Sequence, residues 1–268
     1  MSSYFAHKKS LGQNFLTNPQ VLRRSLEAGQ LDADDVVLEI GPGQGALTKM
    51  LLTSPCRFVH AVEIDRRLED WLAPLERSYP ERFRVTWADA LECDFAALAP
   101  APDKVLANIP YHITTELIWK ILIDLAPLGL SRLILLIQKE AAVRLRAKEQ
   151  SRDRGPLGVT IEMMGAITMI MNVSPGSFTP PPNVWSQLIT IEISRKQTLA
   201  ADPKWRFLLS AAFSQRRKKI VKNLLHAGYQ PARLEDVFSF AAISVNARAE
   251  ELTGKQWLDL YHALTHDE

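Results

Sequence analysis

The sequence predicts an α/β protein in which a mostly parallel, seven-stranded sheet is followed by a small all-helical domain. In the first two-thirds of the chain, short β-branched apolar runs alternate with amphipathic stretches, which is typical of strands joined by helices. After Ser194 no strand-like run is found, and apolar residues recur at helical spacing. We therefore expect a boundary near residue 198, with domains at 1–197 and 198–268.

The predicted strands and helices alternate in chain order. Parallel strands are expected at Val36–Ile40, Phe58–Glu63, Phe83–Trp87, Lys104–Asn108 and Arg132–Gln138. The helices of this part are expected at Ala46–Thr53, Arg66–Ser78, Thr114–Leu125, Glu140–Lys148 and Pro156–Gly165. Two later extended runs, Ile167–Val173 and Leu188–Ser194, flank a loop whose three consecutive prolines, 180–182, forbid helix. This late pair predicts an antiparallel edge. Helical periodicity then continues at Pro203–Phe213, Gln215–His226, Ala232–Phe240 and Gly254–Leu264.

Charge is distributed unevenly along a chain whose net charge is only +2. Between Arg195 and Gln230 there are nine lysines and arginines and one acid, Asp202, whereas the segment from Pro231 onward has three basic and seven acidic residues. Such asymmetry suggests a surface that faces nucleic acid, although a solvated helix face is the commoner reason for a single basic run.

Several function classes are disfavoured by composition. The cysteines, Cys56 and Cys93, and the six scattered histidines fit no metal-ligand spacing. The first ten residues lack the apolar core of a signal peptide, and the longest apolar run, Leu133–Ile137, is too short to cross a bilayer. We expect a soluble, cytoplasmic protein that contains no metal and contacts no membrane.

A glycine-rich turn follows the first predicted strand. Gly41, Gly43 and Gly45 have the spacing G-x-G-x-G, whereas the dinucleotide fingerprint is G-x-G-x-x-G. Glycines allow a tight turn and the close approach of a ligand, although such a turn can also occur without one. The carboxylate of Glu39, near the strand end, suits a ligand that carries a sulfonium and an ammonium better than it suits a pyrophosphate.

The next two strands also end in acids. Glu63 is placed to accept hydrogen bonds from ribose hydroxyls, while Asp65 can cap the following helix. Asp89 can bind an adenine amine, or can simply form a turn. Together with the glycine turn, these acids are typical of a Rossmann-like class I methyltransferase sheet that binds S-adenosyl-L-methionine. A nicotinamide-dependent dehydrogenase is the weaker alternative.

The fourth strand ends in Asn108-Ile109-Pro110-Tyr111. An adenine amine is a poor nucleophile because its lone pair is delocalised into the ring. The Asn108 side-chain oxygen and the Ile109 carbonyl can accept its two N–H bonds and direct the lone pair at a methyl carbon, with no general base or metal. Pro110 would hold the turn, and Tyr111 and Phe178 would stack on a base removed from its helix. The alternatives are an asparagine-capped turn and aromatic rings that pack in the core.

At this point the chain resembles the ribosomal RNA adenine dimethyltransferases of the small subunit, the kasugamycin-sensitivity enzymes. Seven segments in family order carry the resemblance, which covers nearly the whole chain: Leu11-Gly-Gln-Asn-Phe-Leu16, Glu39-Ile-Gly-Pro-Gly43, Asn108-Ile-Pro-Tyr111, Gln138-Lys-Glu140, Gly155-Pro-Leu-Gly158, Phe178-Thr-Pro-Pro-Pro182 and Phe213-Ser-Gln-Arg-Arg-Lys218. Departures from the family are mild: Ile109 replaces a frequent leucine, Arg154 a common tyrosine and His112 a frequent asparagine.

The resemblance implies an enzyme that dimethylates the 6-amino groups of two adjacent adenosines in a hairpin loop near the 3′ end of small-subunit (16S) rRNA. The substrate would be the assembling small ribosomal subunit, so the enzyme would take part in ribosome biogenesis. The family's cofactor contacts match Asn14, Leu16, Gly41, Glu63, Asp89 and Asn108 here. We expect a monomer, since no interface signal is evident.

A basic segment supplies the expected RNA contacts of the second domain. Arg216, Arg217, Lys218, Lys219 and Lys222 share a predicted helix with apolar residues that include Phe213, Ile220, Leu224 and Leu225. The helix would dock through its apolar side and present the charges to phosphates. Two alternatives to the small-subunit enzyme remain: the sister family that methylates one adenine of large-subunit RNA, and a non-enzymatic binding role such as an assembly checkpoint or a transcription factor.

Overall fold

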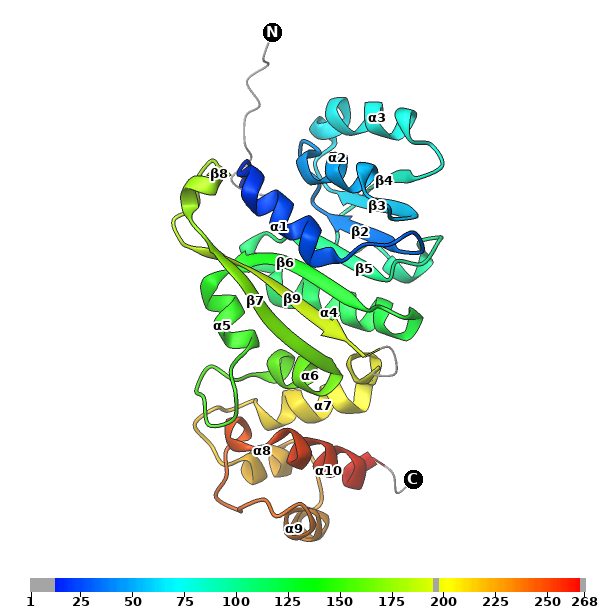
Figure 1. Cartoon of the computed structure of the whole chain (residues 1–268). Helices are drawn as coiled ribbons and strands as arrows, with labels where there is room; N and C mark the ends of the chain where they lie inside the picture. Colours follow the sequence, from blue (N-terminus) through cyan, green and yellow to red (C-terminus); the bar gives the residue numbers. More distant parts are fainter. Residues whose placement is uncertain (1–12, 195–197, 266–268) are drawn as a thin grey trace.

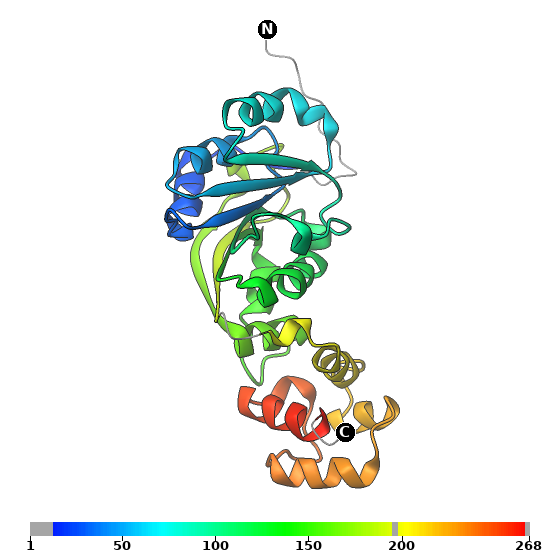
Figure 2. The same cartoon turned by 90° about the vertical axis from the view of Figure 1, so that its right-hand side faces the viewer.

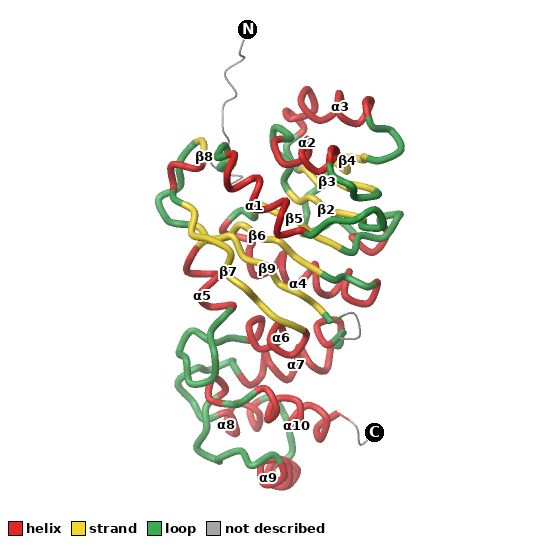
Figure 3. Tube along the Cα trace, viewed as in Figure 1, coloured by secondary structure: helices red, strands yellow, loops and turns green. Residues whose placement is uncertain are grey.

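The computed structural model describes residues 13–194 and 198–265, and within them a seven-stranded sheet has the order β4-β3-β2-β5-β6-β9-β7 (Figures 1 and 3). Five strands are parallel: β2 (Val36–Ile40), β3 (Phe58–Glu63), β4 (Phe83–Trp87), β5 (Lys104–Asn108) and β6 (Arg132–Gln138). Strand β9 (Ser186–Ile193) runs antiparallel to β6 and to the edge strand β7 (Gly165–Val173). The predicted sheet and its antiparallel edge are confirmed.

Two apolar cores lie on opposite faces of this sheet, because adjacent residues of a strand point to opposite sides. Val37 and Leu106 pack under α1 (Pro19–Gly29), α2 (Ala46–Thr53) and α3 (Glu69–Ser78). Leu38 and Val105 pack on the other side with α4 (Thr114–Leu125), α5 (Lys139–Leu145) and α6 (Pro156–Met164). The rigid layers fix where each parallel strand ends, and therefore where the polar residues after those strands meet.

A third core lies in the C-terminal helices, which Figure 2 shows at one end of the molecule beyond α6. These helices are α7 (Pro203–Ala212), α8 (Ile220–His226), α9 (Pro231–Phe240) and α10 (Gly254–Thr265). Their buried side chains, led by Trp205 and Trp257, pack together with Val159 of α6. The indole N–H of Trp205 also donates to Thr160 Oγ1 at 2.9 Å. Helix α6 thus belongs to two cores, one on each side.

Three features at the chain's beginning and at the helix boundaries differ from the expectations. Helix α1 was not predicted, although Asn18 caps it by accepting from the Gln20 amide. A two-stranded sheet of β1 (Phe15–Leu16) and β8 (Phe178–Thr179) was not predicted either. The helix expected from Gln215 starts only at Ile220.

The residues outside the described ranges include several that the sequence analysis names. Leu11 and Gly12 of the first family-like segment, and the basic residues Arg195 and Lys196, belong to them. The expected boundary between residues 197 and 198 lies at the edge of such a gap.

Candidate active site

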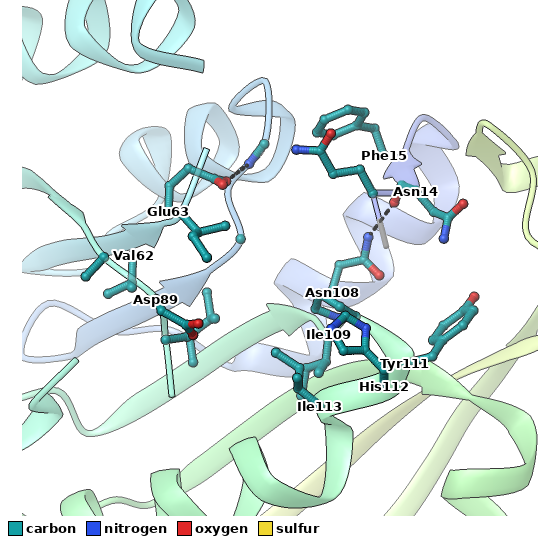
Figure 4. Close-up of a pocket in the computed structure, with 18 residues that line it drawn as sticks. Asn14, Phe15, Val62, Glu63, Asp89, Asn108, Ile109, Tyr111, His112 and Ile113 are labelled. Carbon is teal, nitrogen blue, oxygen red and sulfur yellow. Dashed lines mark hydrogen bonds between the residues drawn. The ribbon is translucent and has the colours of Figure 1, made fainter. Parts of the chain in front are cut away.

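A cavity of about 320 Å³ opens at the carboxyl ends of the parallel strands (Figure 4). Most of the predicted site residues line it: Asn14, Gly41, Gly43, Glu63, Asp89, Asn108, Ile109, Pro110 and Tyr111. They come from four strand ends and from the segment before α1, so the fold brings together residues that are far apart in sequence. Leu16, Glu39 and Phe178 are not among the lining residues.

The glycine turn needs glycine for two physical reasons. Gly41 and Gly43 have φ values of +71° and +57°, a left-handed region that other residues rarely adopt. A Cβ atom at Gly43 would also lie 2.7 Å from ring atoms of Phe15. The Gly43 amide donates to the Glu63 carboxylate at 3.2 Å, so the turn is tied to the next strand.

Glu63 has a fixed carboxylate at the cavity wall. Its other oxygen accepts from the Asp65 amide at 2.8 Å. Burial raises the pKa of Glu63 above its ordinary value, and the backbone donors oppose this rise. Asp65 caps the next turn through the Arg67 amide, as predicted, and also accepts from Gln13 Nε2 at 2.7 Å. The Arg67 side chain, with these donors, lowers the pKa of Asp65 to about 2.

Glu39 lies beneath the glycine turn and not in the cavity wall. It is 2% exposed, and its carboxylate accepts from the Thr48 hydroxyl at 2.7 Å. Burial raises the pKa of Glu39 to about 8, a net value that the Thr48 hydrogen bond lowers and the nearby Glu63 carboxylate raises. Glu39 therefore lies outside the residues that line the cavity, and its direct contact with a charged ligand stays a prediction.

The elevated pKa of Glu39 makes a pH-dependent prediction for stability. A carboxyl whose pKa rises from 4.5 when unfolded to about 8 when folded stabilises the protein only below the lower value. That contribution is lost as the pH rises toward 8. Glu39→Gln cannot ionise at this position. Its melting temperature should therefore rise relative to that of the wild type as the pH increases from 5 to 9. Thermal denaturation of both proteins across this range checks it, and a difference that does not change with pH would refute it.

Asp89 follows β4 and faces the cavity. One carboxylate oxygen, Oδ1, accepts from the Leu91 amide at 2.8 Å, which forms a local turn. The turn that the sequence offered as an alternative is therefore present, and the same residue also lines the cavity. Binding of an adenine amine by Asp89 stays a prediction, and the turn does not conflict with it, since a carboxylate has two oxygens.

Asn108 is oriented by Asn14, a residue that is distant in sequence but adjacent in the fold. Its Nδ2 donates to the backbone carbonyl of Asn14 at 3.0 Å. Figure 4 shows the amide nitrogen directed at Asn14 and the amide oxygen on the side of His112 and Tyr111. The Pro110 carbonyl is occupied by the Ile113 amide at 3.2 Å, so the Ile109 carbonyl is the remaining candidate for a second acceptor.

Tyr111 closes one end of the cavity. Its hydroxyl lies 2.9 Å from Oγ of Ser186, which is fully buried at the start of β9. Burial raises the pKa of the Tyr111 phenol above 10, so the group is neutral at physiological pH. Figure 4 shows the ring well apart from Glu63 and Asp89.

Two expected contacts are not supported by the geometry. The Phe178 side chain is 4% exposed and packs in the core with Val21 and Leu188, so it offers no free face to a base. The structure therefore has the alternative, a packed ring, because the pairing of Phe178 with Leu16 in the small β1–β8 sheet turns both residues toward that core, and a stacking role for Phe178 stays a prediction. Leu16 is half-buried there and does not reach the cavity.

Two residues of the segment before α1 line the cavity but were not predicted from the sequence. Gln13 and Phe15 line the cavity, with apolar neighbours such as Val62, Ile64 and Ile113. A usable signal was the family-like segment Leu11–Leu16 itself, which contains both residues. The Asn14 contact is made by its backbone carbonyl, which side-chain reasoning does not detect.

The basic segment is exposed but is not helical before Ile220. Arg216, Arg217, Lys218 and Lys219 lie in the turn between α7 and α8, and Lys222 lies on α8. A buried side chain imposes this turn: Asn223 Nδ2 donates to the carbonyls of Ala212 at 2.7 Å and Gln215 at 3.2 Å. Ile220 and Leu224 dock as expected, whereas Leu225 is 40% exposed. The single amphipathic helix was therefore a wrong prediction.

Comparison with known proteins decides the family. Residues 4–266 match the family described as ribosomal RNA adenine dimethylase. The chain belongs to this family. It is accordingly an rRNA adenine dimethyltransferase with a class I methyltransferase fold, as the sequence predicted.

Relatives of the rRNA adenine dimethylase family match over nearly their full length. Proteins named ribosomal RNA small subunit methyltransferase A are 36% identical in Fusobacterium nucleatum, over 96% of this chain and 97% of the relative, and 37% identical in Rubrobacter xylanophilus, over 96% and 95%. A solved dimethyladenosine transferase from Plasmodium falciparum is 27% identical with a TM-score of 0.78, covering 92% of this chain and 95% of that one. The 23S rRNA methyltransferase ErmE is 26% identical with a TM-score of 0.68, covering 94% and 99%.

Two features are absent from the described residues of this dimethylase. No helix among them is both long and apolar enough to cross a membrane. The described part of the chain also contains no group of three or more histidine, cysteine and acidic side chains arranged to hold a metal ion.

Proposed function

We propose that this dimethylase uses S-adenosyl-L-methionine to dimethylate the 6-amino groups of two adjacent adenosines in a hairpin loop near the 3′ end of 16S rRNA. The observation that carries the proposal is the orientation of Asn108, whose amide nitrogen is bound by Asn14 while its oxygen remains at the cavity. The substrate would be the assembling small subunit, and the enzyme would act as a cytoplasmic monomer.

The cavity has the chemistry that this cofactor requires. Gly41 and Gly43 line the cavity with left-handed backbone, so the turn presents main-chain atoms to the ligand, and a side chain at Gly43 would collide with the Phe15 ring. Glu63 is held by two backbone amides and would accept hydrogen bonds from ribose hydroxyls. Asp89 would bind the adenine amine. When bound, S-adenosyl-L-methionine supplies a methyl group activated by a positively charged sulfur.

The chain's own residues then prepare the substrate amine. The Asn108 side-chain oxygen and the Ile109 carbonyl accept the two N–H bonds, which favours a pyramidal nitrogen with its lone pair directed away from the ring. These hydrogen bonds strengthen as the nitrogen becomes positive, so they stabilise the transition state more than the bound substrate. The neutral phenol of Tyr111 would stack on the base, and Pro110 would hold the turn.

The ribosomal subunit that the enzyme modifies distinguishes the two related candidates. The relatives named small subunit methyltransferase A support the small subunit, at 36% and 37% identity against 26% for the 23S rRNA enzyme. A purely binding role is disfavoured because the oriented Asn108 has no use without a reacting amine.

Methylation of isolated subunits tests the proposal. The protein is incubated with labelled S-adenosyl-L-methionine and unmethylated small or large subunits, and the methyl groups are mapped by nuclease digestion and mass spectrometry. We expect dimethyladenosine at two adjacent positions of small-subunit RNA alone. Label confined to large-subunit RNA, or no label despite bound cofactor, would refute it.

The basic turn makes a separate prediction about binding. Arg217 and Lys218 are exposed, whereas Arg216 donates to the Arg152 and Arg154 carbonyls and therefore also has a structural role. The double variant Arg217→Ala/Lys218→Ala should weaken particle binding and reduce the slope of log K against log salt by about 1.4 to 1.8, since each of the two lost phosphate contacts contributes about 0.7 to 0.9. Filter binding across a salt series measures this slope. The exposed pair Arg23→Ala/Arg24→Ala on α1 is the matched control, and equal slopes in both variants would contradict the assignment.

A further inference from the structure

A second cavity, of about 430 Å³, adjoins the first, and Tyr111 lines both. Its walls come from the start of α4, the β6–α5 junction, the start of α6 and the basic turn of the C-terminal domain. Tyr111, on whose ring the target base would stack, therefore belongs to the walls of both cavities. The mechanism above uses only the first of them.

Three of the family-like segments have no role in the first cavity but meet in the second. Gln138 and Glu140 come from the first of these segments, Gly155–Gly158 form the second, and Arg216 comes from the third. They lie far apart in sequence, and the fold gathers them beside Tyr111. Such convergence next to a substrate-binding residue points to a binding site for another part of the same substrate.

The chemistry of the second cavity fits a nucleobase better than a phosphate. Its two arginines, Arg144 and Arg216, are balanced by the carboxylates of Glu140 and Asp153. Arg144 pairs with Glu140 at 2.6 Å, and Arg216 is fixed by carbonyls at 2.8 and 2.6 Å. With the Gln138 amide and the Trp119 ring, the lining offers donors, acceptors and an aromatic surface without excess positive charge. A neutral base with its own donors and acceptors is the matching ligand.

We propose that the second cavity receives the base of the nucleotide adjacent to the target adenosine. This inference rests on the proposed function. A base that enters the first cavity must leave its stack, so its neighbour loses a stacking partner. A binding site for that neighbour, one ring away, would compensate the loss and would require a single-stranded pair of nucleotides as substrate.

Gly155 offers a way to fill the second cavity without changing its charges. Its φ of −149° is ordinary extended backbone, and an added Cβ would meet only Arg216 Nη2, at 3.6 Å. Gly155→Leu should therefore fold and occupy the space. Gly176→Leu is the matched control, since Gly176 is exposed and has no atom within 4 Å of the added Cβ. Arg144→Ala, with the exposed Arg24→Ala as its control, provides a second variant if Gly155→Leu is unstable.

The experiment combines these variants with altered RNA. Reconstituted small-subunit particles carry an abasic residue on the 5′ or the 3′ side of the target adenosine, and kcat/KM for its methylation is measured. For the wild type, one of the two abasic particles should react about tenfold more slowly, the loss expected for one base contact. Gly155→Leu should show the same loss on unaltered particles and no further loss on that abasic particle.

The outcomes separate this inference from the proposed function. If the wild type methylates unaltered particles but the two changes are additive, or if neither has an effect, the second cavity does not bind the neighbouring base. If the wild type fails to methylate unaltered small-subunit particles, the proposed function itself is wrong. An equal loss in Gly176→Leu would also overturn the inference, because the effect would then not come from the cavity.

Discussion

Asn108→Ala is expected to lower the rate of methyl transfer to small-subunit particles by about 10²–10³-fold, the loss typical when one preorganised transition-state hydrogen bond is removed. The variant loses the side-chain oxygen that accepts from the substrate amine. It also loses the hydrogen bond between Nδ2 and the Asn14 carbonyl, which is one contact of 3.0 Å at the cavity edge. The glycine turn, Glu63 and Asp89 are untouched, so affinity for S-adenosyl-L-methionine should be largely kept.

Single-turnover rates and titration calorimetry separate these two effects. Asn172→Ala is a suitable control, since Asn172 is an exposed residue of β7 whose side chain accepts from Gln187 at 2.8 Å, away from the cavity. Its turnover should stay close to that of the wild type. Near-normal turnover by Asn108→Ala would reject the proposed activation of the amine, whereas a parallel loss of cofactor affinity would show that Asn108 mainly shapes the cofactor site.

Trp205→Ala is expected to destabilise the C-terminal helices by about 3–5 kcal/mol, as for other fully buried aromatic residues. The indole is 0% exposed and lies edge-on to Tyr261, with ring centroids 5.3 Å apart. Its N–H donates to Thr160 of α6, so the substitution also removes a hydrogen bond between α7 and α6. Particle binding should fall with the loss of these helices, while the cofactor cavity lies elsewhere and should still bind its ligand.

Chemical denaturation, together with cofactor titration, measures both expectations for Trp205→Ala. Phe240→Ala serves as the control because Phe240 is a large apolar residue of the same domain that is 74% exposed. We expect little change in its stability. A small destabilisation by Trp205→Ala would show that the C-terminal helices do not depend on this side chain. A complete loss of cofactor binding would show that the cofactor cavity depends on these helices.

The sheet was predictable because its buried strands are continuous apolar runs between turn residues. All five parallel strands agree with the predicted ranges, from Val36–Ile40 to Arg132–Gln138. Helix α1 was missed although Asn18-Pro19 is a common start signal, an N-cap followed by proline in the first turn. The two-residue strands β1 and β8 could not be found, since their pairing joins segments that are far apart in sequence.

The site was predictable where strand geometry alone places a residue. Glu63 and Asn108 end parallel strands and Asp89 follows one, and the carboxyl ends of these strands meet at one edge of the sheet. Prediction failed where tertiary contacts decide the outcome. The buried Asn223 holds a turn across the basic segment that helical periodicity could not reveal, and the β1–β8 pair turns Phe178 into the core.

The double membership of α6 has a consequence for protein engineering. Val159 and Thr160 face the C-terminal helices, while Leu157 and Ile161 of the same helix pack beneath the sheet. The fully buried Arg154, just before α6, adds an ion pair to Glu162 at 3.1 Å and a hydrogen bond to the Leu252 carbonyl. A chimaera joined at residue 198 would therefore combine the α6 of one parent with the helices of another, so grafting this domain between relatives requires α6 to be redesigned for both neighbours.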